Sequence, residues 1–329
     1  MRLKDPDTIK ENWDALFGKI KEIFLTLYTS QVMFLQDAIK KMDSERCYPG
    51  WNYCQFFLLK ENLSDHYEQL GLLEMALLQF EELEAYFEPF IIQSAEHKAI
   101  GLDSFGAVDH DDDSADVLDS QKKNYRSMIR LNSVTVFDFR CYLFARQCHL
   151  TYRLRRPAEL AKRSLEFIKA TAKLLHEQRL NLRPFFEESW VYSTSLRMVV
   201  FCEQLITKSP TCMTEQATHQ YRVHKAELLF LARRQLDKLG LQCAILPKTM
   251  PFVMATLNAN LDPSTVEGKI SNADLLQAAG DPNKFRDLYE IISKRTIEAM
   301  QTASRQQTIA KILDDISSLQ MFGIHLLLL

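Results

Sequence analysis

Glycine and proline are scarce in this sequence of 329 residues, which contains nine glycines and ten prolines. β-Sandwiches and barrels need frequent turn residues between short strands, so this scarcity argues against an all-β fold. Leucine, lysine, glutamate, glutamine and alanine dominate instead, which is a helical composition. Because 47% of the residues are hydrophobic, the chain can bury a substantial core or a run of stacked helices.

The sequence also lacks an excess of positive charge. Its 40 basic and 43 acidic residues give a net charge of -3, which argues against general nucleic-acid binding. The start MRLKDPD has no apolar core of a signal peptide, and the apolar tail at 321–329 is far shorter than the roughly 20 residues of a membrane-spanning helix. These features predict a cytosolic protein with reduced thiols.

None of the seven cysteines forms a CxxC pair. Cys47 and Cys54 are seven residues apart, as are Cys141 and Cys148, so each pair is expected to share a helical face. Zinc ligation would need a second pair of ligands with suitable spacing, which the sequence does not offer. Buried small hydrophobic side chains are the favoured interpretation.

Motifs of common enzyme chemistry are missing as well. The sequence has no phosphate-binding loop, dinucleotide fingerprint, GxSxG or HExxH. His219 and His224 are five residues apart and should point to different sides of a helix. Cys148 and His149 are adjacent, so the imidazole would not face the thiol that it would have to activate. The sequence predicts no catalytic, cofactor-binding or metal site.

Helix-spaced apolar residues fill the stretch from Tyr53 to Pro89 on both sides of Gly71. A turn at Gly71 would fold the second helix back on the first. Seven residues there have the spacing of a tetratricopeptide-like unit and are expected to pack the hairpin: Leu63, Ser64, Tyr67, Gly71, Ala76, Phe80 and Leu83.

A second hairpin follows at 137–168. If Ala161 is equivalent to Ala76, Tyr152 takes the place of Tyr67, which indicates a weak internal repeat. A single hairpin leaves an outer apolar face open, so it needs neighbours. We therefore predict an all-α fold, an α-solenoid of tetratricopeptide-like hairpins. The residues expected to pack the second hairpin are Phe144, Cys148, Tyr152, Ala161 and Leu165.

Residues 5–43 carry a further amphipathic pattern, either as a helix pair or as a single bent helix. Apolar residues recur there at three- and four-residue steps: Trp13, Leu16, Phe17, Ile20, Ile23, Phe24 and Leu27. Such a helix could lie on a membrane, but its lysines are offset by acidic residues. Packing against a core is therefore favoured.

The organisation predicted from these patterns has five parts. Residues 1–93 hold the amino-terminal helices and the first hairpin, and 94–124 form a disordered acidic linker. Residues 125–245 hold further helical hairpins, 246–283 form a loop-rich connection, and 284–329 hold a last helix and the apolar tail. Because a helical stack normally finishes with a polar capping element, the tail suggests a fragment or an alternative end.

The linker is predicted from its composition, since 103–119 contains seven aspartates and no lysine or arginine. A calcium loop at Asp109, Asp111 and Asp113 lacks the glycine at its sixth position and the glutamate at its twelfth.

The most basic cluster of the chain follows the first helix of the second hairpin. It consists of Arg153, Arg155, Arg156, Lys162 and Arg163. This cluster could contact an acidic lipid surface or an acidic partner. A solvated turn and helix end is the favoured alternative, because Glu159 and Glu166 are interleaved with the basic residues.

Several stretches together resemble one family: Pro49–Trp51, the hairpin segment 70–87 and the segment 137–167, with weaker likeness at 187–196 and 231–243. The chain resembles the subunit 10 family of the trafficking protein particle (TRAPP) complex, a large subunit of the TRAPP II form. The resemblance covers most of residues 10–245, and its most specific part lies around Arg140 to Arg156. It corresponds to the helical middle of a longer protein.

This resemblance implies a non-catalytic scaffold subunit placed around small core subunits that together act as a guanine-nucleotide exchange factor for Rab GTPases. It implies the small subunits and the other large TRAPP II subunit as partners, and a cytoplasmic location at the periphery of the Golgi. An alternative from the residues alone is a tetratricopeptide-like adaptor that holds a peptide in a groove. That adaptor would need several Lys, Arg and Asn side chains converging on one groove, and the sequence shows no such set. A helical enzyme is a third alternative.

Overall fold

The computed structural model describes residues 6–48, 51–97, 116–177, 182, 184–243, 245 and 280–304. Over these residues the chain is helical and has no strand, so the predicted all-α class is confirmed. Two compact units are present. Unit 1 holds the described residues up to 97 together with 124–134, and unit 2 holds 116–123 together with the described residues from 135 on.

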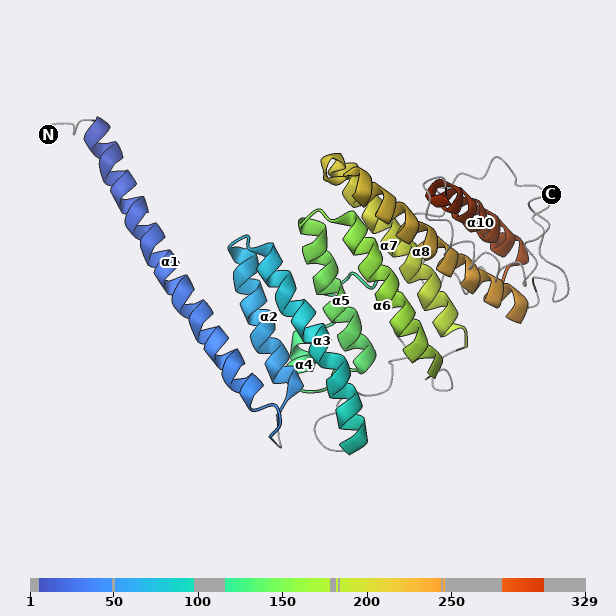
Figure 1. Cartoon of the computed structure of the whole chain (residues 1–329), viewed down its shortest axis with the longest axis horizontal. Coiled ribbons are helices and arrows are strands. Elements are labelled where there is room, and N and C mark those ends of the chain that lie inside the picture. Colours follow the sequence, from blue (N-terminus) through green and yellow to red (C-terminus); the bar gives the residue numbers. More distant parts are fainter. Residues whose placement is uncertain are drawn as a thin grey trace. The chain divides into compact units, whose positions relative to one another are not determined.

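Unit 1 consists of a long helix, a helical hairpin and a short helix (Figure 1). Its elements are α1 (Pro6–Ser44), α2 (Tyr53–Gln69), α3 (Leu73–His97) and α4 (Tyr125–Arg130). The carboxyl-terminal half of α1 packs on α2, where Leu35 is buried and Gln36 Nε2 donates to the Tyr67 hydroxyl at 3.0 Å. At the end of α1, the Trp51 indole donates to the carbonyl of Met42 at 2.8 Å.

Helix α2 ends in a turn in which Gly71 adopts a left-handed backbone conformation, which glycine adopts without strain. Gly71 has φ +76, in the left-handed region, and its N–H donates to the carbonyl of Glu68 at 3.1 Å. The N–H of Leu72 donates to the carbonyl of Tyr67 at 2.9 Å. These two bonds make a Schellman motif, which satisfies carbonyls that the helix end would leave unpaired. The hairpin predicted from the sequence is therefore present, with its turn at Gly71.

Unit 2 stacks two helical hairpins and a further helix. Its elements are α5 (Val136–Arg153), α6 (Pro157–Glu177), α7 (Phe186–Lys208), α8 (Glu215–Gln242) and α10 (Pro282–Ser304). Helix α6 packs on both α7 and α8, and α10 packs on the other side of α8 (Figure 1). One hydrophobic cluster joins all five helices; in it Phe144 stacks on Phe167 with ring centroids 3.9 Å apart.

Local side-chain chemistry marks where several helices begin. Asn52, Asn124, Thr135 and Thr214 precede α2, α4, α5 and α8, and each side chain accepts a hydrogen bond from the backbone N–H three residues on. Such caps satisfy donors that have no partner inside the helix. The second hairpin turn repeats the Schellman pattern of the first, with Arg155 at φ 58 in place of a glycine.

Some predictions about the segments between helices differ from the structure. Helix α3 continues through Pro89, and its described end at 94–97 extends into the segment predicted as a linker. At the other end of that segment, Val117 and Leu118 are buried in the core of unit 2. Residues 98–115, including Asp109, Asp111 and Asp113, lie outside the described residues, as do most of 246–283 and everything after 304. Among the helices that are described, none has the length and hydropathy needed to cross a bilayer.

One of the two cysteine pairs also differs from the prediction. Cys141 and Cys148 are both buried in α5, as small hydrophobic side chains would be. Cys47 is exposed in the turn after α1, whereas Cys54 is buried in α2. The prediction that Cys47 and Cys54 share a helical face is wrong, because α1 ends at Ser44 and a new helix begins at Tyr53.

Candidate interaction sites

The described residues hold no cluster of three or more His, Cys, Asp or Glu side chains that could bind a metal ion. Cys148 is fully buried, whereas the His149 ring is paired with the carbonyl of Leu118 at 2.8 Å. Burial raises the pKa of the Cys54 thiol from 9.0 to about 12 and also raises the pKa of Cys141 and Cys202. These thiols are therefore held in their neutral, weakly nucleophilic form.

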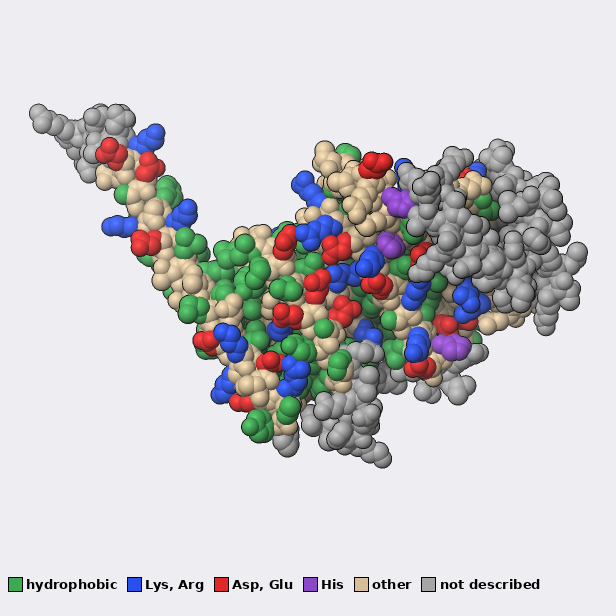
Figure 2. Space-filling view, in the orientation of Figure 1, with side chains coloured by type: hydrophobic (Ala, Val, Ile, Leu, Met, Phe, Trp, Pro, Cys, Tyr) green, Lys and Arg blue, Asp and Glu red, His purple; other side chains and the backbone are tan. Residues whose placement is uncertain are grey.

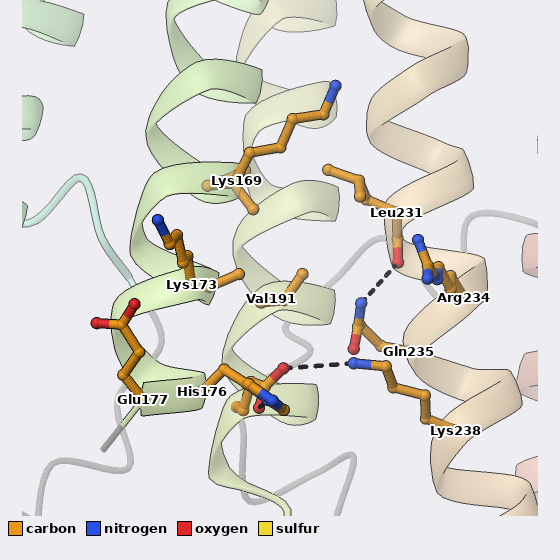
Figure 3. Close-up of a pocket in the computed structure, with 12 residues that line it drawn as sticks. Lys169, Lys173, His176, Glu177, Val191, Leu231, Arg234, Gln235 and Lys238 are labelled. Atoms are coloured by element: carbon orange, nitrogen blue, oxygen red, sulfur yellow. Dashed lines mark hydrogen bonds and ion pairs between the residues drawn. The ribbon is translucent and has the colours of Figure 1, made fainter. Parts of the chain in front are cut away.

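A groove with a volume of about 440 Å³ lies between α6, α7 and α8 in unit 2 (Figure 3). Helices α6 and α8 form its two walls, and α7 lies between them. The volume is within the range of about 300–1,000 Å³ that is typical of ligand sites. The groove is lined by Ile168, Lys169, Ala172, Lys173, His176, Glu177, Glu187, Val191, Leu231, Arg234, Gln235 and Lys238.

Cationic side chains stand on both walls of this groove. Lys169 and Lys173 are one turn apart on α6, and Arg234 and Lys238 are one turn apart on α8 (Figure 3). Since residues four apart lie on the same side of a helix, each wall presents a pair of positive groups to the same space. The groove thus collects four cations that are far apart in the sequence.

Two of these four cations are neutralised within the structure. Lys169 Nζ lies 3.0 Å from Glu227, on α8, and Lys238 Nζ lies 3.3 Å from Glu187, at the start of α7. The carboxylate of Glu187 also lies 3.1 Å from His176 Nδ1. Lys173 and Arg234 have no ion-pair partner among the residues that the structure describes. The groove therefore keeps one cation without an ion-pair partner on each wall, and the exposed carboxylate of Glu177 lies one turn beyond Lys173 on the α6 wall.

The floor of the groove is apolar, with one polar exception. Ile168 and Val191 are buried, and Ala172 and Leu231 are partly buried beside them. Gln235 is 5% exposed; its amide nitrogen donates to the carbonyl of Leu231 at 3.4 Å. Its Oε1 atom is buried and has no hydrogen-bond partner in the structure. An unsatisfied buried acceptor costs about 1–3 kcal/mol, and a donor could reach this nearly inaccessible atom only after the Gln235 side chain turned towards the groove.

A second candidate site is on α1 of unit 1. The residues expected to pack against a core are exposed instead: Trp13, Leu16, Phe17, Ile20, Ile23, Phe24 and Leu27, here called the α1 stripe. Trp13, Phe17 and Phe24 are 53%, 60% and 70% exposed. Figure 2 shows hydrophobic side chains along this helix. The core-packing prediction is therefore wrong for the described part of the chain, because α2 reaches only the other half of α1.

Further exposed apolar side chains lie at the tip of the α2–α3 hairpin. They are Leu70, Leu72, Met75 and Leu78. The ring of Tyr28 lies 5.4 Å from that of His66, near the end of α2. This contact places the last turn of α2 beside α1 just after the α1 stripe ends.

The predicted basic cluster lies at the turn between α5 and α6, and its charges are largely paired. Arg156 and Arg163 lie 3.6 and 3.4 Å from Glu159, and Lys162 lies 3.9 Å from Glu166. Arg153 and Arg155 are exposed in the same turn. These short-range pairs at the start of α6 are typical of a helix end, and contact of the cluster with a partner stays a prediction.

Most of the residues predicted to pack the hairpins lie inside their units, whereas Gly71 is exposed because it forms the turn. In the first hairpin, Leu63, Ser64, Tyr67, Ala76, Phe80 and Leu83 are buried, and Ser64 Oγ donates to the carbonyl of Ala76 at 3.1 Å. In the second hairpin, Phe144, Cys148, Ala161 and Leu165 are buried. Tyr152 is partly buried and stacks on Phe201 of α7, with ring centroids 4.6 Å apart.

The sequence did not reveal the cationic groove. The sequence feature that corresponds to this groove is the four-residue spacing of Lys169 and Lys173 and of Arg234 and Lys238. That spacing alone describes a solvated helix face, and only the packing of α6 against α8 brings the two faces together. The folded chain thus brings four Lys and Arg side chains to one groove, two of them in ion pairs, although no Asn lines it.

Curated proteins from several organisms are similar to this chain. The trafficking protein particle complex subunit 10 of Dictyostelium discoideum is 35% identical over 196 residues, which is 60% of this chain and 14% of that relative. The mouse protein of the same name is 24% identical over 332 residues, 97% of this chain and 26% of the relative. A trafficking protein particle complex II-specific subunit 130 homolog from Arabidopsis thaliana is 34% identical over 190 residues, 57% of this chain and 14% of the relative.

The chain spans between about a seventh and about a quarter of the length of these curated relatives. No family model matches it, and no solved structure matches it. The mouse relative covers nearly the whole chain, whereas the more identical relatives cover somewhat more than half. The resemblance to the subunit 10 family, drawn first from particular segments of the sequence, is confirmed by these homologues.

Proposed function

We propose that this chain is a non-catalytic scaffold segment of a TRAPP complex, in its TRAPP II form, and that it acts in ER-to-Golgi and intra-Golgi transport. Its partners are the small core subunits and the other large TRAPP II subunit. Through them it is linked to Rab GTPases and to the Golgi membrane, where the assembly is peripherally associated. The names of its homologues support membership of such a complex.

The structural observation that carries this proposal is the α1 stripe. Soluble proteins rarely expose a contiguous run of large apolar side chains unless it binds another molecule. Trp13, Ile20 and Leu27 are seven residues apart, and the intervening Phe17 and Phe24 widen the stripe beyond the narrow seam of a two-helix coiled coil. A stripe of this width fits between two neighbouring helices. Its expected occupant is therefore a helical hairpin of another subunit.

The charge around the α1 stripe favours a protein over a lipid surface. Residues 10–27 contain three lysines, Lys10, Lys19 and Lys21, and three acidic residues, Glu11, Asp14 and Glu22. Helices that bind anionic membranes carry a basic polar face, which this balance does not provide. Apolar contact with another protein is the interaction that remains for these side chains.

The test is to co-express the tagged chain with the small core subunits and the other large subunit, and to purify it under mild conditions. We expect those subunits to be recovered in fixed proportion. The chain alone should leave nucleotide release from a Rab GTPase unchanged, because it has no exchange activity. A folded chain that recovers none of the subunits, or one that accelerates nucleotide release by itself, would contradict the proposal.

A specific observation also favours a second function, that of a peptide-binding adaptor. The groove between α6 and α8 brings together Lys and Arg side chains from two helices, which is part of what such an adaptor requires. This function needs no membership of a tethering complex, and it can coexist with the scaffold role because the groove and the α1 stripe lie in different units.

A further inference from the structure

The groove between α6, α7 and α8 combines three kinds of binding group in one space. Each kind restricts what can occupy the groove, and together they define the chemical class of the occupant.

The first group is the spare positive charge. Lys173 on α6 and Arg234 on α8 are exposed and stand on opposite walls (Figure 3). Neither has an ion-pair partner within the described ranges, whereas Lys169 and Lys238 do. Charge complementarity between a groove and its ligand raises both association rate and specificity. The occupant should therefore carry negative groups that reach both walls.

The second group is the apolar floor. Val191 and Ile168 are buried at its base, and Leu231 and Ala172 are partly buried beside them. A fully hydrated anion such as inorganic phosphate would gain nothing from this surface. A ligand that places an apolar side chain on the floor would remove both surfaces from water, which is favourable. The occupant should therefore be amphipathic.

The third group is the Oε1 atom of Gln235, which is buried and lacks a donor. Carboxylates are acceptors only, so an acidic group cannot satisfy this atom. A peptide backbone supplies an N–H donor at every residue except proline. An extended peptide thus offers all three complements at once: a backbone N–H, an apolar side chain and acidic side chains.

We propose that this groove binds an extended acidic peptide segment of a partner protein, in which acidic residues flank one large apolar residue. The acidic side chains pair with Lys173 and Arg234, and the apolar side chain lies on Val191 and Leu231. A backbone N–H of the segment donates to Gln235 Oε1 once that side chain has turned towards the groove. This proposal rests on the second proposed function, that of a peptide-binding adaptor, and specifies its ligand; it is independent of the scaffold role.

The test measures the fluorescence anisotropy of a labelled eight-residue peptide, with two aspartates on each side of one leucine, titrated with the purified full chain. Three altered peptides separate the three contacts: aspartate replaced by asparagine, leucine replaced by serine, and the backbone methylated at the leucine nitrogen. We expect each alteration to weaken binding at least fivefold. Added salt should also weaken binding of the parent peptide.

Two sets of chain variants locate the binding. The double variant Lys173→Glu and Arg234→Glu should bind the peptide at least tenfold more weakly. Lys294→Glu makes the same kind of change at an exposed lysine of α10 that does not line the groove, and it should alter affinity less than twofold. Gln235→Met removes the unpaired acceptor at similar volume. It should weaken the parent peptide but not the methylated one.

Some results would overturn the proposal. One is equal binding by the Lys173→Glu and Arg234→Glu variant and by the Lys294→Glu variant. Another is equal affinity for the aspartate and asparagine peptides. Competition by millimolar inorganic phosphate as strong as that by unlabelled peptide would identify a general anion site instead. If Gln235→Met fails to fold, the two charge variants still decide the matter, because both alter exposed side chains.

Discussion

Replacing two aromatic residues of the α1 stripe tests whether this surface joins the chain to its partners. The change is Phe17→Gln together with Phe24→Gln. The two rings are 60% and 70% exposed, and glutamine has a slightly better helix propensity than phenylalanine. Surface substitutions of this kind usually change the free energy of unfolding by less than about 0.5 kcal/mol. The variant should therefore fold as the wild-type chain does.

The loss of binding can be worked from the exposed area. An aromatic side chain offers about 200 Å², so the two rings present roughly 260 Å² to water. At about 25 cal/mol per Å², covering this area would contribute at most about 6.5 kcal/mol. Ordering and desolvation on association reduce that figure, and central aromatic residues of interfaces typically contribute 2–4 kcal/mol. We expect a loss of about 3 kcal/mol, which is roughly 100-fold in affinity.

The assay is a titration of the labelled chain with a purified assembly of the small core subunits and the other large subunit. Thermal unfolding followed by circular dichroism is measured in parallel. The matched control is Leu131→Gln with Leu241→Gln, since both leucines are exposed and lie outside the α1 stripe. The control should bind as tightly as the wild-type chain.

Three outcomes would refute this reasoning. If the Phe17 and Phe24 variant binds with unchanged affinity, the α1 stripe is not the interface. If the leucine control loses as much affinity, the effect comes from surface hydrophobicity in general. If the variant unfolds several degrees below the wild-type chain, the two rings are covered in solution, contrary to their exposure in the structure.

Three further measurements test the fold. The carboxylate of Glu61 is 1% exposed and lies 2.9 Å from the guanidinium of Arg126 on α4. Arg126→Met leaves that buried charge without this partner, so it should reduce the free energy of unfolding by about 2 kcal/mol in chemical denaturation. Adding Glu61→Gln removes the charge and should recover part of the loss. Arg155 has φ 58, so Arg155→Gly should raise the unfolding temperature by relieving about 1 kcal/mol of backbone strain, and a lower temperature would contradict the left-handed turn. Burial raises the pKa of the Cys54 thiol from 9.0 to about 12, so the folded chain binds the thiol proton more tightly than the unfolded chain does. The stability that comes from this tighter proton binding is present below pH 9 and is lost as pH rises towards about 12. Cys54→Ala should flatten that loss in unfolding measured between pH 8 and pH 11.

Much of the fold could be predicted from the sequence because its signals are local. Gly71 is placed for a left-handed residue at a helix end, and the spacing of Tyr67, Ala76 and Phe80 describes one buried face. The second hairpin was expected at 137–168, and the structure has it as α5 and α6, at Val136–Arg153 and Pro157–Glu177. Periodicity determines such elements without knowledge of their neighbours.

The interaction sites could not be predicted in the same way, because they depend on which faces meet. Phe17 and Phe24 have the periodicity of core residues, and only the shorter length of α2 leaves them exposed. Lys173 and Arg234 are ordinary surface cations until two helices place them across one groove. The composition of 103–119, with its seven aspartates, likewise predicted a disordered linker. Val117 and Leu118 lie within this segment and are nevertheless buried.

The order in which the chain supplies its two units has a consequence for how the gene can be altered. The described residues contribute to unit 1, then to unit 2, then to unit 1 through α4, and then to unit 2 again. A splice junction or recombination point at 134 would separate Val117 and Leu118 from the core in which they are buried. A junction at 116 would separate α4, with its Arg126, from α2, on which α4 packs. Neither unit can thus be cut out as one uninterrupted segment of the chain, so the two should be transferred to another protein only together.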